Sequence, residues 1–390
     1  MERRAFLGTA GAAGMALSAQ TPAPAKKYRA GVIGLGWTGL LYDLAKRTDD
    51  RFNVEDVNRP TPPLNIHRKY YHHDHPGEEG LPQSYSEALW SRPEVELVAG
   101  ADRDTKRLAP FTERYGIKAV YTDAIEMMKN ERLDIVAVCT NTKGRSFLTV
   151  KAAEMGAKGI VAEKPMCHTL AEADKMVKAC ADRKIPLSCG AISTTHPSFA
   201  KAKELVRNGV IGDLLSIETR GPSAQHQNWS YFLDSELAWV VGTGDSPRRE
   251  SGSDEFTGQG MAVARSGLTV HFRKGAPGVR LSGSKGEISF DYSRGGWQLQ
   301  VELDTPAGKH HVESPWPSPQ FVRPYHAVYT VDDVVACLEG RMDEPKNSGR
   351  RVAAALEAEV ALKQSSKQGG AKIDLPLADR SLGLNYDWFR

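Results

Sequence analysis

The sequence predicts a two-domain α/β protein, in which a Rossmann domain with a parallel sheet precedes an α+β domain with an open, mostly antiparallel sheet. The chain has 390 residues, which is more than a single hydrophobic core normally organises. Short apolar runs alternate with helical patterns up to about residue 192, as in a doubly wound sheet. Beyond that point, strand-like runs separated by glycine turns follow one another, as in an antiparallel sheet.

The predicted Rossmann domain covers residues 26–192 and begins with a buried strand over Tyr28–Ile33, because this apolar run ends at a glycine. A helix is expected from Trp37 to Lys46. Residues 50–82 are polar and rich in proline, which predicts a loop inserted into the domain. Further strands and one strongly patterned helix are predicted at Glu94–Ala101, Leu133–Cys139, Gly159–Ala162, Pro186–Gly190 and, for the helix, Leu170–Asp182.

The second predicted domain covers residues 193–390 and should shape the substrate site and the contacts between subunits. A helix over Phe199–Asn208 leads into its sheet. The predicted strands are Leu214–Glu218, Gly260–Val263, Leu268–Phe272, Val279–Ser282, Glu287–Phe290 and Trp297–Leu303. Two helices, Val331–Leu338 and Gly349–Ser366, should close the chain.

Composition excludes several classes of function. Hydrophobic residues make up 40% of the chain and charged residues 25%, which is typical of a soluble globular protein. The formal net charge of +3 is too small to indicate a nucleic-acid partner. No stretch reaches the roughly 18 consecutive apolar residues of a membrane span, so we expect no membrane anchor.

The first 25 residues read as a targeting segment. Arg3 and Arg4 precede an apolar stretch over Phe6–Leu17, and small residues then allow cleavage after Ser18 or Ala25. This order predicts a twin-arginine signal peptide, which exports a folded protein to the periplasm. The alternative is a disordered basic tail.

Cysteine and histidine usage gives no metal site. The five cysteines lie far apart without a C-x-x-C pair, so we expect buried, unreactive thiols rather than disulfides or a zinc site. The inserted loop holds a histidine patch without a regular ligand spacing. We interpret it as structural, with contact to the substrate as the alternative, and the residues concerned are His67, His72, His73 and His75.

A glycine-rich turn after the first strand predicts a dinucleotide site. It has the G-x-G-x-x-G spacing in Gly34, Leu35, Gly36, Trp37, Thr38 and Gly39. Such glycines let the backbone approach a pyrophosphate at the start of the following helix. Asp102 ends the second predicted strand, where an acid holds the ribose hydroxyls and favours NAD over NADP. Arg103 beside it keeps NADP open, and the inserted loop explains why Asp102 lies further along the chain than the usual ~20 residues.

A second motif makes the resemblance specific. The segment Ala162-Glu163-Lys164-Pro165-Met166 resembles the Glu-Lys-Pro signature of the glucose–fructose oxidoreductase / inositol dehydrogenase (Gfo/Idh/MocA) family. The resemblance extends through Val95–Arg103, Gly283–Gly286 and Ile373–Leu377, and so over nearly all of the chain after the leader. It implies that Lys164 hydrogen-bonds the substrate hydroxyl, that Pro165, cis in many members, fixes the lysine, and that the cofactor also meets Thr140, Asn141, Arg145 and Glu163.

Two positions depart from the family pattern. The family usually shows Asp-x-Gly-x-His-x-x-Asp with histidine as the base, whereas this chain has Gln227 at the first Asp position, Tyr231 at the His position, and Asp234. We predict that Tyr231 pairs with Lys164 as the catalytic base and that Asp234 orients the pair. His226 and His196 are the alternative bases. Arg145 stands where many members have histidine.

The resemblance implies an NAD(P)-dependent oxidoreductase that acts on a secondary hydroxyl of a sugar or cyclitol. Because free cofactor is scarce outside the cytoplasm, we expect it to be tightly bound and recycled in place. The alternatives are an NAD-dependent glycosidase that oxidises, eliminates and reduces again, and a ligand-binding protein that has lost the chemistry. An open sheet with one bare face predicts a homodimer or homotetramer.

Overall fold

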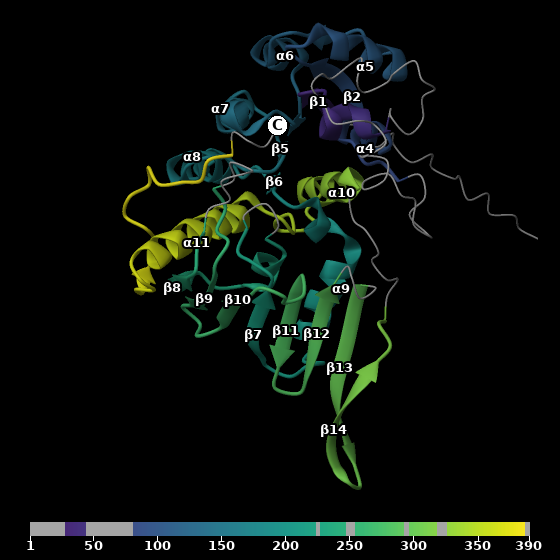
Figure 1. Ribbon diagram of the computed structural model, residues 1–390. Helices are drawn as coiled ribbons and strands as arrows, with labels where there is room; N and C mark the ends of the chain where they lie inside the picture. The colour runs from purple at the N-terminus through teal and green to yellow at the C-terminus, as the bar shows by residue number, and fades with distance from the viewer. Residues whose placement is uncertain are drawn as a thin grey trace, which may run out of the picture.

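The computed structural model describes residues 28–43, 81–223, 227–246, 254–291, 296–317 and 326–386. The predicted leader, most of the predicted inserted loop with its histidine patch, and His226 lie outside these ranges. Two sheets organise the described part of the chain, with the parallel sheet at the top of Figure 1 and a larger sheet below it. This confirms the predicted fold class.

The first sheet has six parallel strands in the order β3-β2-β1-β4-β5-β6. Its strand order reverses between β1 and β4, which is where doubly wound sheets bind ligands, beyond the carboxyl ends of the strands. The strands are β1 (Tyr28–Ile33), β2 (Val95–Ala101), β3 (Val120–Tyr121), β4 (Ile135–Val138), β5 (Gly159–Ala162) and β6 (Leu187–Cys189).

Helices cover both faces of this sheet. One face carries α6 (Ala124–Glu131), α7 (Thr142–Glu154) and α8 (Leu170–Ala181), and α5 (Leu108–Tyr115) follows β2. The other face carries α4 (Tyr85–Trp90) and, from far along the chain, α10 (Ala327–Leu338). The apolar residues of α10 pack in one cluster with β1 and α4. A helix from the C-terminal half therefore completes the Rossmann domain.

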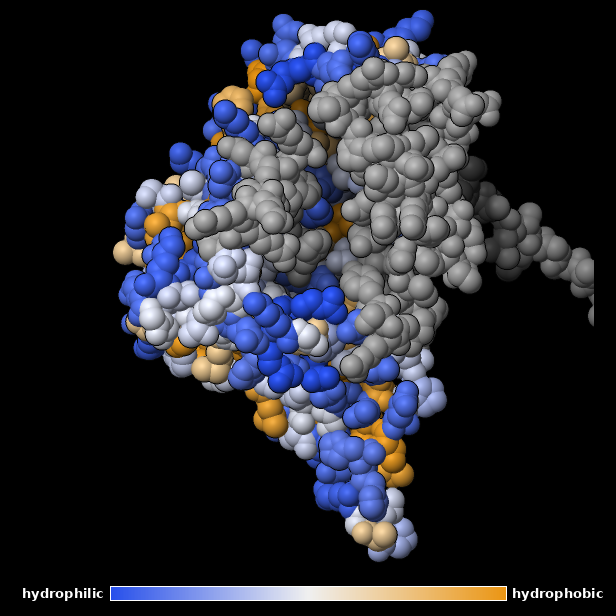
Figure 2. Space-filling model, in the orientation of Figure 1, coloured by the Kyte–Doolittle hydropathy of each residue, from blue (hydrophilic) through white to orange (hydrophobic). Residues whose placement is uncertain are grey.

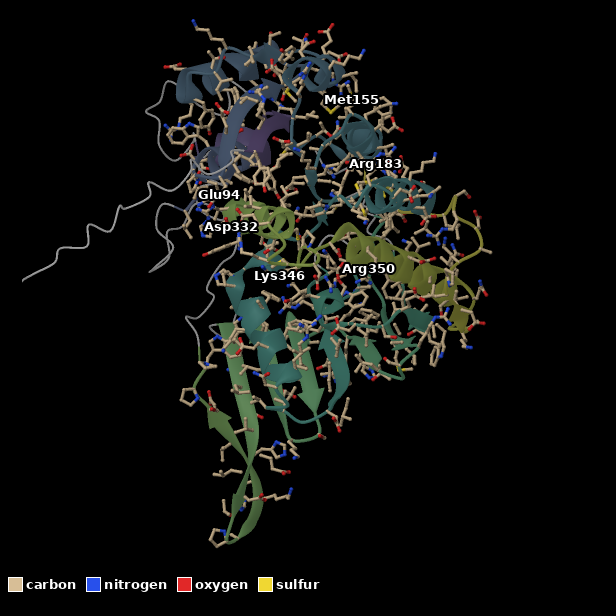
Figure 3. The ribbon with its side chains drawn as sticks, turned by 180° about the vertical axis from the view of Figure 1, so that it is seen from behind. Glu94, Met155, Arg183, Asp332, Lys346 and Arg350 are labelled. Atoms are coloured by element: carbon tan, nitrogen blue, oxygen red, sulfur yellow. The ribbon has the colours of Figure 1, made fainter. Side chains whose placement is uncertain are left out.

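The approach of α10 is close enough to require a glycine on β5. A Cβ atom on Gly159 would lie 2.6 Å from Cγ1 of Val334. Arg92, just before β2, forms an ion pair with Asp332 on the outer side of the same helix, with 2.7 Å between Nη2 and Oδ2. Figure 3 shows Asp332 beside Glu94 on this side of the molecule.

The second sheet has nine strands in the order β14-β13-β12-β11-β7-β10-β9-β8-β15, and only the β7–β10 pair is parallel. On β7, Ile217 and Thr219 are buried against the helices, while Ser216 and Glu218 face away and are partly exposed. The strands are β7 (Leu214–Thr219), β8 (Leu237–Thr243), β9 (Gln259–Ala264), β10 (Thr269–Phe272), β11 (Val279–Gly283), β12 (Gly286–Asp291), β13 (Gly296–Thr305), β14 (Gly308–Ser314) and β15 (Ile373–Asp374).

Two helices join the second sheet to the first domain. Helix α9 (Pro197–Arg207) packs on the inner face of the sheet through Phe199, which contacts Trp297. Helix α11 (Gly349–Lys367) lies between β8 and α8 (Figure 1). After it, the chain returns to the Rossmann domain, where Leu170 donates its backbone N–H to the carbonyl of Leu382.

The surface of the described residues is mostly hydrophilic, as the composition of the chain predicts. Figure 2 shows mainly hydrophilic residues on the face in view, with an apolar patch beside the β13–β14 hairpin, where Leu303 and Val312 are exposed. None of the helices among the described residues has the length and apolarity of a membrane-spanning segment.

The predicted strands of both sheets are present, with shifts of a few residues at their ends. The predicted helix from Trp37 begins as a π-helical turn over Trp37–Leu41, and the described stretch ends two residues later. The elements that the sequence did not predict are the strands β3, β8, β14 and β15 and the helices α5, α6 and α7. The boundary between residues 192 and 193 stays a prediction.

Candidate dinucleotide and catalytic site

The glycine-rich turn lies at the carboxyl end of β1, in the conformation that close backbone contact requires. Gly34 has a φ of +90°, and a Cβ atom there would lie 2.8 Å from the carbonyl carbon of Cys139. A Cβ atom on Gly39 would lie 1.9 Å from the carbonyl oxygen of Gly34. Any other residue would push the turn away from the sheet. The turn thus fits the cradle that a pyrophosphate needs.

Asp102 lies at the end of β2, next to this turn. Its Oδ2 accepts a 2.7 Å hydrogen bond from the backbone N–H of Leu35, and its Oδ1 accepts one of 2.8 Å from the N–H of Asp104. Leu35 therefore acts through its backbone, because its side chain is buried. A carboxylate has about four acceptor positions, so Asp102 retains capacity for ribose hydroxyls.

Two arginines accompany Asp102. Arg103 is exposed on the loop after β2. The sequence did not predict Arg107. Its Nη1 lies 3.4 Å from Oδ2 of Asp102 and 3.5 Å from the position that a Cβ of Gly36 would take. The only signal for it was a cation shortly after the predicted ribose ligand.

The ends of β4 and β5 bring the second set of predicted residues to the same edge. Glu163 donates its backbone N–H to the carbonyl of Val138, so the segments after the two strands run side by side. Thr140 and Asn141 follow β4, and the side chain of Asn141 makes no capping bond to α7. The carboxylate of Glu163 accepts a 2.9 Å hydrogen bond from the backbone N–H of Lys164.

Lys164 lies in an unusual electrostatic environment. Burial lowers the pKa of its amine, Arg145 lowers it further, and the carboxylates of Glu163 and Glu255 oppose both effects. The peptide bond between Lys164 and Pro165 is cis. The sequence did not predict Glu255, because no motif surrounds it. Its carboxylate accepts a 2.8 Å hydrogen bond from Oγ of Ser223.

In the structure Arg145 bonds the backbone of the protein itself, and its predicted contact with the cofactor stays a prediction. Its side chain is almost fully buried, and its two terminal nitrogens donate to the backbone carbonyls of Pro165 and Thr140. Both donors thus point into the protein.

The contacts of Tyr231 and Asp234 oppose the predicted pairing with Lys164. The ring of Tyr231 lies 4.8 Å from Nζ of Lys203 and 5.5 Å from Cζ of Arg351. Asp234 forms an ion pair with Lys203. Burial raises the pKa of Tyr231 to about 12, whereas a base needs a lowered value.

His196 also has a structural role. It precedes α9, and its Nδ1 accepts a 3.1 Å hydrogen bond from the backbone N–H of Ser198, which caps the helix. Its ring packs edge-on against Tyr329. Gln227 is buried and its Oε1 accepts from the backbone N–H of Ala191. The bond between Gln227 and Ala191 links the second domain to the segment after β6.

The cysteines are free thiols, and burial raises the pKa of Cys180, Cys189 and Cys337 to about 12. Raised thiol pKa values agree with the predicted lack of reactivity. Among the residues that the structure describes, no group of three or more His, Cys, Asp and Glu side chains is placed to hold a metal ion.

Known proteins resemble this chain in sequence. Residues 77–191 match the model of the Gfo/Idh/MocA group, described as an oxidoreductase family with an NAD-binding Rossmann fold. Myo-inositol 2-dehydrogenase of Thermotoga maritima is 28% identical over 199 residues, 47% of this chain and 59% of the relative. D-apiose dehydrogenase of Paraburkholderia graminis is 34% identical over 118 residues, 30% and 31% of the two chains. The chain thus aligns with less than two thirds of the length of these relatives.

Solved structures resemble the whole fold. An aldose-aldose oxidoreductase from Caulobacter crescentus, complexed with glycerol, has a TM-score of 0.60 at 19% identity, with 90% of this chain and 100% of that chain covered. An oxidoreductase from Agrobacterium radiobacter, in complex with NAD⁺, L-tartaric acid and magnesium, has a TM-score of 0.60 at 18% identity, with 90% and 98% covered. At these identities the likeness shows the fold. The family model adds a likeness in sequence over residues 77–191: this part of the chain is similar to the NAD-binding oxidoreductases of the Gfo/Idh/MocA group.

Proposed function

We propose that the protein is an NAD(P)-dependent oxidoreductase that acts on a secondary hydroxyl of a sugar or cyclitol. One observation carries the proposal: the glycine turn tied to Asp102 and the partly buried Lys164 follow strands of the same parallel sheet, at their carboxyl ends. Doubly wound sheets bind their ligands at this edge. The names of the relatives, which include inositol, apiose and levoglucosan dehydrogenases, support the substrate class.

Different residues of the site would bind the cofactor and the substrate. The glycine turn Gly34–Gly39, Asp102, Thr140 and Asn141 would hold the dinucleotide, which supplies a hydride acceptor when bound. Lys164 would accept the proton of the substrate hydroxyl. Its lowered pKa increases the neutral fraction of the amine, the form that a base requires. Lys164 thus replaces Tyr231 as our candidate for the base.

The proposal is tested on the purified full-length protein. Mass spectrometry after gentle denaturation should release NAD or NADP in near-stoichiometric amount. Turnover is then followed as reduction of the bound nicotinamide, with myo-inositol and D-apiose as the first substrates. Absence of any dinucleotide, together with no affinity for added NAD or NADP, would contradict the proposal. A nitrophenyl glycoside separates the oxidoreductase from an NAD-dependent glycosidase, which would release nitrophenol.

We also propose that residues 1–25 export the folded protein to the periplasm with its cofactor bound. The order of Arg3-Arg4, apolar stretch and small residues supports this. A fusion of these residues to a folded reporter should reach the periplasm, and replacing both arginines by lysine should stop it. Export of the doubly substituted fusion would remove the argument for a cofactor that does not exchange.

For the assembly we propose a homodimer or homotetramer that forms through the outer face of the nine-stranded sheet. Ser216 and Glu218 of β7 show that this face is partly exposed in the single chain. An open sheet face is a common place for two copies to meet. Light scattering on the purified protein should give a mass of two or four chains, and the mass of one chain would refute the proposal.

A further inference from the structure

The guanidinium of Arg145 joins the two segments that follow the neighbouring strands β4 and β5. Arg145 lies in the first turns of α7 and is 2% exposed. Its Nη1 donates to the carbonyl of Pro165, which follows β5, and its Nη2 donates to the carbonyl of Thr140, which follows β4. One of these segments carries the predicted contacts to the cofactor, and the other carries Lys164.

We infer that Arg145 is a positioning residue: it holds the segments after β4 and β5 together and so fixes Lys164 against the dinucleotide site. The inference rests on the proposed function, because it assigns Arg145 a part in the same site. The planar guanidinium suits the task, since its donors form a rigid fork that reaches two acceptors at once. A lysine at this position would offer a single point of contact.

The cost of burying this cation supports a specific role. A buried charge is expensive unless hydrogen bonds and an opposite charge compensate it. Burial lowers the pKa of Arg145, and the carboxylate of Glu163 opposes that shift. The same carboxylate accepts the backbone N–H of Lys164. Arg145, Glu163 and Lys164 thus form one continuous group, in which the arginine both fixes the backbone and places a positive charge near the amine.

The charged groups that shift the pKa of Lys164 come from several segments of the chain, and each of them affects the pH at which the amine loses its proton. Glu163 and Glu255 favour the protonated amine, while burial and Arg145 favour the neutral amine. Removing Arg145 takes away a positive charge that lowers the pKa of Lys164, and it frees the segment that holds the lysine. Both changes raise this pKa, because a less confined amine is also better solvated.

The experiment measures Lys164 directly and needs neither substrate nor cofactor. Wild type and the variant Arg145→Ala are labelled with acetic anhydride over a pH series, and peptide mass spectrometry reads the labelling midpoint of Lys164. We expect the midpoint of Arg145→Ala to lie about 1 unit or more above that of wild type. Added guanidinium ion, well below denaturing concentration, should restore the wild-type midpoint by filling the vacated site. Methylammonium should not restore it.

The matched control is Arg183→Met, because Arg183 is exposed beyond the end of α8 (Figure 3) and donates to the carbonyl of Ala179. Its Lys164 midpoint should equal that of wild type. If folded Arg145→Ala also keeps the wild-type midpoint, the inference is wrong. Failure of wild type to bind any dinucleotide would refute the proposed function and leave this measurement intact.

A second variant covers the case in which Arg145→Ala does not fold. Arg145→Lys keeps the positive charge and most of the volume but holds one carbonyl instead of two. We expect its thermal midpoint to stay close to wild type, while the labelling rate of Lys164 at high pH rises several-fold because the segment opens. A labelling profile identical to wild type in Arg145→Lys would overturn the inference.

Discussion

Lys164 carries the chemistry proposed for this chain, and its surroundings set the pH at which it can work. Because burial and Arg145 lower the pKa of its amine, the neutral form gains population as the pH rises through a value below the ~10.4 of a free lysine. Turnover should therefore rise with pH across that range. The pH profile of kcat in the holoenzyme checks this, and a profile that falls there would exclude a neutral lysine as the base.

Replacing Lys164 should remove activity without removing the cofactor. Loss of a positioned base typically lowers the rate about 10²–10⁴-fold, so we expect a fall of this size in Lys164→Met with dinucleotide still bound. Tyr231→Phe is the comparison. It keeps the ring against Lys203 and Arg351, and we expect nearly unchanged turnover. A large loss in Tyr231→Phe would return Tyr231 to the role that the sequence predicted.

Asp102 should set the choice between the two cofactors. A carboxylate disfavours the 2′-phosphate of NADP, so Asp102→Asn should weaken NAD binding more than NADP binding. Asparagine retains an oxygen for the N–H of Leu35, whereas Asp102→Ala also loosens the glycine turn and should weaken both. Fluorescence titration with NADH and NADPH measures the difference. Equal losses in Asp102→Asn would mean that Asp102 does not contact the ribose.

At the scale of elements, Asp43 fastens the start of α4 to the turn after β1. Its carboxylate accepts the backbone N–H groups of Gln83 and Ser84 and the hydroxyl of Ser84, and all three residues are buried. Each buried donor left without an acceptor costs about 1–3 kcal/mol. We expect Asp43→Ala to lower the free energy of unfolding by on the order of 3 kcal/mol, measured in urea.

The isosteric variant Asp43→Asn provides the control for this prediction. It keeps one oxygen in place for the same donors, and we expect it to lose much less stability. Equal stability of Asp43→Ala and wild type would show that the ends of the predicted inserted loop are held by other contacts.

The elements that sequence reasoning found and missed differ in their physical origin. Strands β1, β4 and β5 are buried on both sides, so their apolar runs identify them. Strand β14 is exposed along nearly its whole length, so its sequence carries no apolar pattern. Strand β3 has two residues, too few for any periodicity.

The site shows the same division. The glycine turn and the Glu-Lys-Pro segment are local motifs, and the structure brings them to one edge of the sheet. The partners of Tyr231 come from α9 and α11, far apart along the chain, and only tertiary packing reveals them. The same holds for Glu255, whose charge raises the pKa of Lys164, and for the carbonyls that accept hydrogen bonds from Arg145.

Across the whole molecule, the stability of the Rossmann domain should depend on α10. A Gly159→Ala substitution would drive a methyl group into Val334 and cost about 1–3 kcal/mol through overpacking. Val334→Ala would lose ~0.8 kcal/mol per buried methyl group and leave a cavity. The new methyl of Gly159→Ala would occupy that cavity in the double variant. The double variant should therefore lose less free energy of unfolding than the two single variants lose together, by roughly 0.5–3 kcal/mol. Strictly additive losses would show that the two positions do not touch.

The position of α10 also bears on how the chain is made. The last strand of the parallel sheet, β6, ends at Cys189, but the helix that covers the sheet ends at Leu338. At the usual ~5–20 residues per second, the ribosome needs on the order of ten seconds to travel between these points. During that interval the nascent sheet shows to the cytosol the apolar residues that α10 later covers, a surface for chaperones. The first domain to be synthesised therefore cannot be finished until most of the chain has been made, and export of a folded protein would have to wait for its last third.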